Sequence, residues 1–100
     1  MIMRIWTGRT PVAKADAYLK LMRTMALPDY RGVDGCRGAW VTRHIEGDIA
    51  TFRTVSLWDS LDAIEVFAGT PADAARYYDF DQDFLLELEP RVIHAEAWED

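Results

Sequence analysis

Residues 36–58 read CRGAWVTRHIEGDIATFRTVSLW, and this stretch decides the fold. Its two halves, 36–46 and 49–58, are rich in the β-branched and aromatic residues that favour strands. Gly47 and Asp48 stand between the halves, and a two-residue turn of this composition is typical of a β-hairpin. The sequence therefore predicts two antiparallel strands joined by a tight reversal.

The same turn sets the register of the hairpin. A two-residue connection places Trp40 opposite Val55 and Arg43 opposite Phe52. These pairs are a sharp expectation, because a slip of one residue would move every side chain to the other face of the sheet.

A strand and a helix are expected before the hairpin. Residues 2–9 are rich in β-branched and aromatic types and form the first strand. Apolar residues then recur at spacings of three and four over residues 12–26, which predicts an amphipathic helix. Thr10 and Pro11 suit the start of this helix, and Pro28 is expected to lie beyond its end.

A second helix and a last strand are expected after the hairpin. Asp59 or Ser60 caps a helix over 61–68, and Gly69 closes it. The remaining expectations are a short helical piece after Thr70-Pro71, a solvated acidic loop over 79–83, and a final strand over 91–98.

The order of these elements is β-α-β-β-α-β within a single domain of 100 residues. This order predicts an α+β fold of the ferredoxin-like type, in which a four-stranded antiparallel sheet carries helices on one face.

Both faces of the predicted sheet carry bulky apolar side chains. Helices can cover only one face, so the other needs a partner, and a second copy of the same chain is the simplest one. We therefore expect a homodimer joined through its sheet faces. One face holds Ile2, Trp6, Phe52, Trp58, Val92 and Trp98, and the other holds Met3, Ile5, Val55, Leu57 and Ile93.

Charge and composition exclude several kinds of partner. The net charge is −6 and the basic residues form no run, so neither nucleic acid nor an anionic membrane surface is expected. The single cysteine, Cys36, has no partner for an internal disulfide, and no apolar stretch is long enough for a signal peptide or a membrane span. These features predict a cytoplasmic protein.

Motifs that bind cofactors are absent from the sequence. It has no Gly-rich phosphate loop, no paired-cysteine motif and no Ser-His-Asp spacing, so neither a cofactor nor a metal is expected. His94 and Glu96 share a face of the last strand and, with His44, form a weak candidate for a metal site. The alternative is that His44 is a surface residue and His94 a hydrogen-bonded interior one, or a base.

Aromatic residues make up 12% of the chain and concentrate in its second half. Buried Trp and Tyr need hydrogen-bond partners, so their number favours a pocket for a flat ligand between sheet and helices as much as it favours plain core packing.

Three segments resemble a known family. They are LWDSLDAI at 57–64 with Phe67 beyond it, AARYY at 74–78, and GCRG at 35–38. Together with the order of elements, they resemble the antibiotic-biosynthesis monooxygenase family of dimeric α+β barrels. The resemblance implies a cofactor-free monooxygenase that acts on a small aromatic or quinol-type substrate.

The heme-degrading branch of this family fits poorly. Its members carry Asn, Trp and His at positions that correspond here to Thr7, Phe67 and Tyr77. Because no histidine stands there to bind the iron, the resemblance disfavours heme degradation.

Under the monooxygenase hypothesis, the candidate catalytic residues are Tyr77, Tyr78 and His94, which would transfer protons or hydrogen-bond the substrate. The candidate substrate-binding residues are Thr7, Trp40, Trp58, Phe67 and Arg43, with Arg53 as an alternative to Arg43 for holding a phenolate. Two other functions stay open. One is a non-redox isomerase or cyclase, and the other is a non-catalytic protein that binds a small aromatic molecule.

Overall fold

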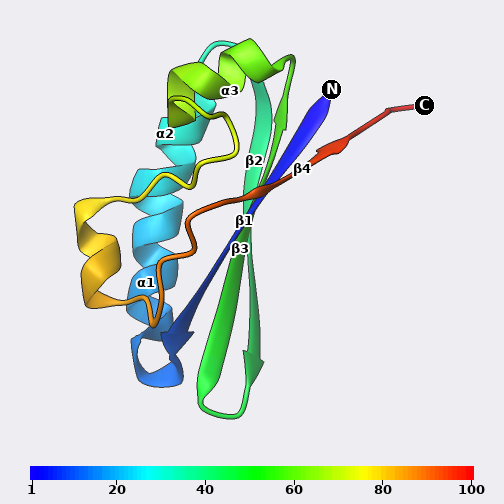
Figure 1. The fold of residues 1–100 in the computed structure, drawn as a ribbon. Helices are drawn as coiled ribbons and strands as arrows, with labels where there is room; N and C mark the ends of the chain where they lie inside the picture. Colours follow the sequence, from blue (N-terminus) through cyan, green and yellow to red (C-terminus); the bar gives the residue numbers. More distant parts are fainter.

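The computed structural model describes residues 1–100 and has the predicted α+β architecture. Its four strands form one antiparallel sheet in the order β2-β3-β1-β4, which is the ferredoxin-like arrangement. All helices lie on one side of this sheet (Figure 1). The elements are β1 (Ile2–Pro11), α1 (Ala15–Leu21), α2 (Leu27–Arg31), β2 (Cys36–Glu46), β3 (Ile49–Trp58), α3 (Leu61–Ala68) and β4 (Ile93–Glu96).

The hairpin formed by β2 and β3 has the predicted register. Trp40 pairs with Val55 and Arg43 with Phe52. Gly47 adopts a positive φ of 58° at the turn, a conformation that glycine reaches without strain. The only irregularity is a shift of pairing between Cys36 and Gly38, at the far end from the turn.

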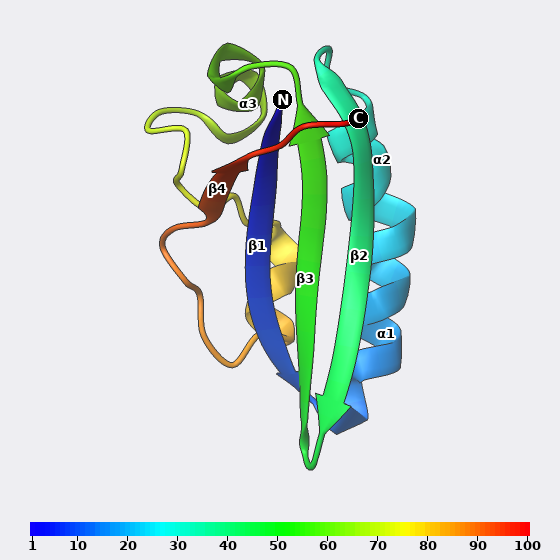
Figure 2. The ribbon, with the colours of Figure 1, turned by 90° about the vertical axis from the view of Figure 1, so that its right-hand side faces the viewer.

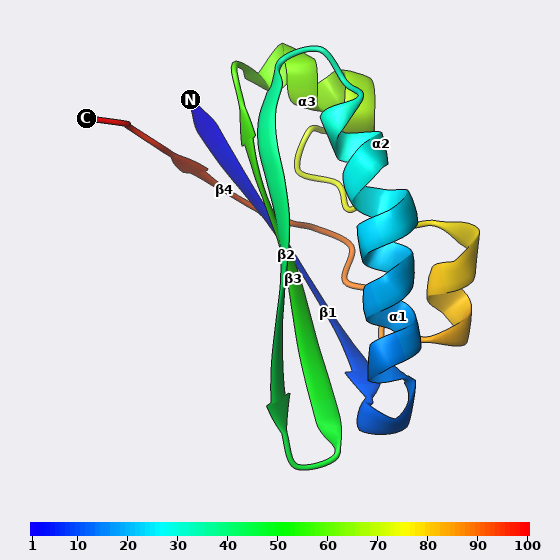
Figure 3. The same cartoon turned by 180° about the vertical axis from the view of Figure 1, so that it is seen from behind.

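The first helix differs from the prediction at both ends. Thr10 and Pro11 belong to β1, so they do not start the helix. Lys14 is the N-cap residue of α1, and its side chain makes no capping hydrogen bond. The helix also continues past Pro28 as one rod through α2 (Figure 3). A wider π-helical turn over Met22–Ala26 precedes the proline, and the amide of Leu27 donates to the Met22 carbonyl. This wider turn accommodates a residue that has no amide hydrogen.

The two faces of the sheet have different surroundings. The face toward the helices carries most of the core: Trp6, Ala39, Ala50, Phe52 and Trp58 pack there against Tyr18, Met22, Tyr30, Ile64 and Phe67. No helix covers the opposite face, which Figure 2 shows toward the viewer. None of the helices is long and apolar enough to span a membrane.

The second of the two predicted helices corresponds to α3, and its ends are as predicted. Ser60 is its N-cap and accepts a hydrogen bond from the Ala63 amide, and Gly69 follows its last residue with a φ of 82°. The prediction of a helical piece after Thr70-Pro71 is wrong. Residues 72–78 form an irregular segment, which an isolated β-bridge between Ala74 and Arg91 joins to the C-terminal part of the chain. The last strand is shorter than predicted.

The cap of α3 gives a simple stability prediction. Ser60→Ala removes the oxygen that accepts the Ala63 amide, so the free energy of unfolding is expected to fall by about 1 kcal/mol. Ser60→Asp keeps an acceptor at the cap and should retain wild-type stability. Urea unfolding of the three proteins measures both values, and equal losses in the two variants would contradict a capping role.

The acidic stretch over residues 79–83 is not the solvated loop that was expected. It forms a short 3₁₀ helix, Asp79–Asp83, and buries Asp81. One carboxylate oxygen of Asp81 accepts the Tyr18 hydroxyl at 2.7 Å, and the other accepts the Tyr78 amide at 2.7 Å. Asp81 thus joins this segment to α1.

Burial raises the pKa of the Asp81 carboxyl above its usual value, although both hydrogen bonds favour the carboxylate. A carboxyl whose pKa is raised by folding stabilises the protein while it is protonated, and this contribution is lost as the pH rises through the folded pKa. The wild type should therefore gain stability relative to Asp81→Asn as the pH falls from 7 to 4. Urea unfolding across this range, with the exposed Asp83→Asn as control, tests the sign. A constant difference would contradict it.

Candidate functional site

The eight predicted site residues do not share one pocket. Thr7 and Trp40 lie on the open face of the sheet, because their neighbours in the strands, Trp6 and Ala39, are the residues buried against the helices. Thr7, the position compared with the heme-degrading branch, therefore points away from Phe67. Arg43 lies at the rim of the helix side, where it pairs with Asp16 at 2.7 Å.

Trp58 and Phe67 do lie together on the helix side, but they belong to the packed core. Their ring centroids are 5.6 Å apart, and Tyr30 stacks on Phe67 at 4.4 Å. The three cavities of the structure all lie elsewhere. A pocket for a flat ligand was expected between sheet and helices, and where Trp58 and Phe67 lie that space is filled by side chains.

The two tyrosines hold other segments in place through their hydroxyl groups. Tyr77 donates to the Glu89 carbonyl at 2.6 Å, and Tyr78 donates to an Asp29 carboxylate oxygen at 2.8 Å. Burial is the main cause that raises both pKa values above the usual range for tyrosine. Both hydroxyl groups are therefore protonated at neutral pH and already donate their protons within the fold.

Arg4 is the unusual polar group of the interior. It lies near the N-terminal end of β1 with only 2% of its surface exposed. Its Nη1 donates to the Ala72 carbonyl at 2.7 Å and its Nη2 to the Ala74 carbonyl at 2.8 Å, so it holds the irregular segment against the sheet. Its Nε has no partner.

The guanidinium of Arg4 has no carboxylate partner. Asp73 lies close enough to act on its charge, but the ion pair of Asp73 is with Arg91, at 2.8 Å. Burial lowers the pKa of Arg4, yet arginine stays charged under all ordinary conditions. Buried charges are normally paired, so an unpaired cation marks this end of the fold as a place suited to an anion.

His94, on β4, is in direct contact with this cation. Arg4 Nη1 and His94 Nε2 are 3.2 Å apart. Arginine can only donate, so Nε2 accepts, and in the neutral imidazole the hydrogen must then sit on Nδ1. Burial and the nearby Arg4 charge lower the pKa of His94, which keeps the ring neutral at pH 7. His94 is consequently a hydrogen-bond donor polarised by a buried positive charge.

His94 also lines a cavity of about 230 Å³. This cavity, the His94 pocket, lies where the first and last strands meet α3. Its walls are Ile2, Leu61, His94, Ala95 and Glu96. Apolar side chains, an imidazole and a carboxylate line it together, which is a combination expected of a small-molecule site.

A second arginine, Arg76, lies close to the ring of Phe67 in the core. Arg76 stacks 4.6 Å from the centroid of Phe67 and 5.2 Å from that of Tyr78, and it pairs with Asp29 at 2.9 Å. The Arg4 guanidinium lies 5.7 Å from the centroid of the same Phe67 ring. Arg4 and Arg76 thus both lie against the Phe67 ring, and only Arg76 forms an ion pair with a carboxylate.

The metal site considered from the sequence does not form. His44 lies on β2 and His94 on β4, which are the two opposite edges of the sheet. The structure contains no group of three or more His, Cys, Asp or Glu side chains placed to hold a metal ion. The hypothesis of a site built from His44, His94 and Glu96 is therefore wrong.

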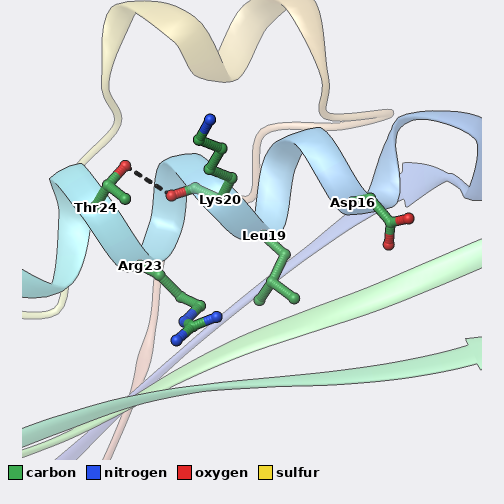
Figure 4. Close-up of a pocket in the computed structure, with 5 residues that line it drawn as sticks. All are labelled: Asp16, Leu19, Lys20, Arg23 and Thr24. Atoms are coloured by element: carbon green, nitrogen blue, oxygen red, sulfur yellow. Dashed lines mark hydrogen bonds between the residues drawn. The ribbon is translucent and has the colours of Figure 1, made fainter.

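A shallow hollow along α1 is not a convincing site either. Figure 4 shows Leu19 and Arg23 pointing toward the strands, while Lys20 and Thr24 point away from them. Every residue that lines this hollow comes from one helical run, and Thr24 donates to the Lys20 carbonyl of that same helix.

Sequence reasoning missed Arg4, although a signal was present. Arg4 stands between Ile2 and Trp6, on the same face of the strand as these two apolar residues. A charged residue at an inward position of a half-buried strand is rare enough to indicate a functional site or a buried polar network.

Comparison with known proteins gives the fold. No protein-family profile matches the sequence, and no curated protein resembles it significantly. Among solved structures, PA3566 from Pseudomonas aeruginosa superposes with a TM-score of 0.67 at 18% identity, over 96% of this chain and 94% of that protein. Rv0793 from Mycobacterium tuberculosis superposes with a TM-score of 0.60 at 16% identity, over 100% of this chain and 98% of that protein. The chain shares the α+β fold of these two proteins along essentially its whole length.

Proposed function

We propose that this chain is a cofactor-independent monooxygenase, similar to the antibiotic-biosynthesis monooxygenases, that oxidises a small electron-rich phenol bound in the His94 pocket. The observation that carries the proposal is the buried, unpaired Arg4 guanidinium in contact with the neutral His94 at the wall of that pocket. A phenolate in the pocket would supply the missing negative charge.

The chemistry begins with loss of the phenol proton. His94 Nδ1–H, polarised by Arg4, stabilises the phenolate oxygen and so lowers the pKa of the bound phenol. Glu96 lines the same pocket and is the carboxylate that accepts the proton. This assignment gives His94 the role of anion binding and leaves Tyr77 and Tyr78 as residues that position the surrounding segments.

The phenolate is itself the reductant. It transfers one electron to O₂, the resulting pair of radicals combines at the ring carbon para to the oxygen, and the peroxide loses water to leave a carbonyl at that carbon. The balance is one phenol and one O₂ giving one para-quinone and one water. The ring loses four electrons and O₂ gains four, so no external reductant is needed.

The size of the pocket limits the substrate. Sites for drug-sized ligands measure roughly 300–1,000 Å³, and the His94 pocket is smaller, at about 230 Å³. A single aromatic ring fits this volume better than a fused polycyclic substrate does.

Oxygen consumption tests the proposal. Purified, metal-free protein is supplied with electron-rich single-ring phenols and quinols, with naphthoquinols and anthrones as larger substrates, and spontaneous oxidation is subtracted. We expect enzyme-dependent uptake that favours single rings and disappears in His94→Phe. Absence of such uptake across the panel would overturn the proposal. Product formation without oxygen would assign an isomerase or cyclase instead, and binding without product would assign a carrier.

We also propose that a second copy of the chain covers the apolar half of the open sheet face. That half carries Met3, Ile5, Trp40, Val55, Leu57 and Ile93, and the side chains of Trp40 and Ile93 are largely exposed. Exposed apolar patches of this kind mark interaction surfaces. We expect sedimentation to show a dimer at micromolar concentration for the wild type and for Val66→Lys, on the outer face of α3, but a monomer for Val55→Lys. A monomeric wild type would contradict the proposal.

A further inference from the structure

The chain leaves a bay beside the first strand on the open face of the sheet. β4 accompanies β1 only over Ile2–Ile5, and the next backbone contact along this edge is the hydrogen bond from the Leu86 amide to the Arg9 carbonyl, at 2.9 Å. Between these two points the segment 87–92 bows away from β1 (Figure 2). A cavity of about 580 Å³, the β1 bay, lies there.

The bay is lined by Ile5, Thr7, Arg9, Arg53, Glu89, Arg91, Val92 and Ile93. Three arginines and one glutamate give this lining a net positive charge in a protein whose net charge is −6. The concentration of cations here is therefore not a reflection of the overall composition.

Of the three arginines that line the bay, Arg53 is the one without an ion-pair partner. Arg9 pairs with Glu87 and Arg91 pairs with Asp73, whereas Arg53 takes part in none of the ion pairs of the structure. Arg53 lies directly opposite Thr7 in the register of β1 and β3, so its side chain and the Thr7 hydroxyl share this face.

The far wall of the bay is held in place by the fold. The Tyr77 hydroxyl donates to the Glu89 carbonyl at 2.6 Å, the Ala75 amide to the Pro90 carbonyl at 2.9 Å, and the Val92 amide to the Asp73 carbonyl at 2.8 Å. Because these hydrogen bonds hold the wall in place, a ligand can bind without the cost of ordering this segment.

The bay adjoins the apolar half of the open face, and Ile5 and Ile93 belong to both. Along β1 and β3, the pairs Met3 with Leu57 and Ile5 with Val55 are apolar, and the next pair on this face, Thr7 with Arg53, is polar. The open face thus changes from apolar to polar at the position of the bay.

We propose that the β1 bay binds a small organic carboxylate with an apolar body. The Arg53 guanidinium donates two parallel hydrogen bonds to the carboxylate, and the Thr7 hydroxyl donates a third. Ile5, Val92 and Ile93 contact the apolar body. This site is distinct from the His94 pocket, which lies on the other side of the sheet and is less than half as large.

Calorimetric titration with 2-naphthoate tests the site, with 2-naphthamide as a neutral probe of the same shape. We expect 2-naphthoate to bind and 2-naphthamide to bind at least about tenfold more weakly, because charge-assisted hydrogen bonds are lost. Arg53→Gln should weaken 2-naphthoate binding about 10- to 100-fold, and Thr7→Val by a smaller factor. Arg43→Gln, on the other face of the sheet, is the matched control and should bind as the wild type does.

Two further measurements distinguish binding in the β1 bay from binding in the His94 pocket and from contacts between copies of the chain. His94→Phe should leave 2-naphthoate binding unchanged, and loss of binding in this variant would overturn the proposal by placing the ligand in the His94 pocket. Sedimentation of Arg53→Gln should match the wild type. Weaker self-association with unchanged 2-naphthoate binding would also overturn it, since Arg53 would then serve contacts between copies. Equal binding of 2-naphthamide and 2-naphthoate would refute the carboxylate preference.

Discussion

Trp58→Ala is expected to lower the free energy of unfolding by about 3–5 kcal/mol, as truncation of a fully buried aromatic side chain does. Trp58 has no exposed surface, and its Nε1 donates to the Ser56 hydroxyl at 2.8 Å. The variant leaves a cavity against Phe67 and an unpaired hydroxyl. Domains of this size have only roughly 5–15 kcal/mol of stability, so the loss would move the urea midpoint far toward zero.

Trp98→Ala is the matched control for this variant. Trp98 is 79% exposed near the C-terminus, where removal of a side chain changes stability by no more than about 0.5 kcal/mol. Equal effects of the two substitutions would contradict the assignment of Trp58 to the core. A small loss at Trp58 alone would show that the interior collapses to fill the space.

Arg4→Met is expected to reduce binding of a phenolate in the His94 pocket about 10²- to 10³-fold, because it removes the charge that polarises the His94 donor. Loss of a preorganised donor to an oxyanion lowers catalytic rates by this factor. The substitution removes the positive charge that polarises His94 and frees His94 Nε2. It also leaves the carbonyl groups of Ala72 and Ala74 without a donor. Stability is expected to change less than binding, because the cost of these two carbonyls is offset by removal of an unpaired buried charge.

Arg43→Met provides the comparison, since it removes an arginine that already has a carboxylate partner, Asp16. Titration with a phenol, followed by urea unfolding of each variant, separates binding from stability. If Arg4→Met folds and binds the phenolate as tightly as Arg43→Met does, Arg4 has no role in the site.

The parts of the fold that local rules determine could be predicted from the sequence. The hairpin register follows from a two-residue turn, and the ends of α3 follow from Ser60 and Gly69. The continuation of the helix past Pro28 could not be predicted in this way, because a π-helical turn is rare and leaves no clear sequence signal.

The segment between α3 and β4 was the least predictable. Its shape depends on contacts with residues far away in the sequence, such as Tyr18 with Asp81 and Arg4 with Ala72. A run of acidic residues indicates a solvated loop unless one of them has a buried partner, and nothing near Asp81 in the sequence identifies Tyr18 as that partner.

The candidate site was predicted only in part for the same reason. Residue types pointed to His94 and to the aromatic residues, but the face that each strand residue occupies decides which of them meet. The alternation of the first strand separates Thr7 from Trp6, and it places Arg4 on the inner face with Trp6. The partner segment of Arg4 lies almost seventy positions away, which only the folded structure reveals.

Spectrophotometric titration of 4-nitrophenol with the purified protein tests the central claim most directly, because the anion of this phenol absorbs visible light and the neutral form does not. We predict that the protein binds the anion and lowers the apparent pKa of the bound phenol, and that His94→Phe and Arg4→Met abolish the shift. Binding of the neutral form, or an unchanged pKa with all three proteins, would contradict the claim that Arg4 and His94 form an oxyanion-binding pair.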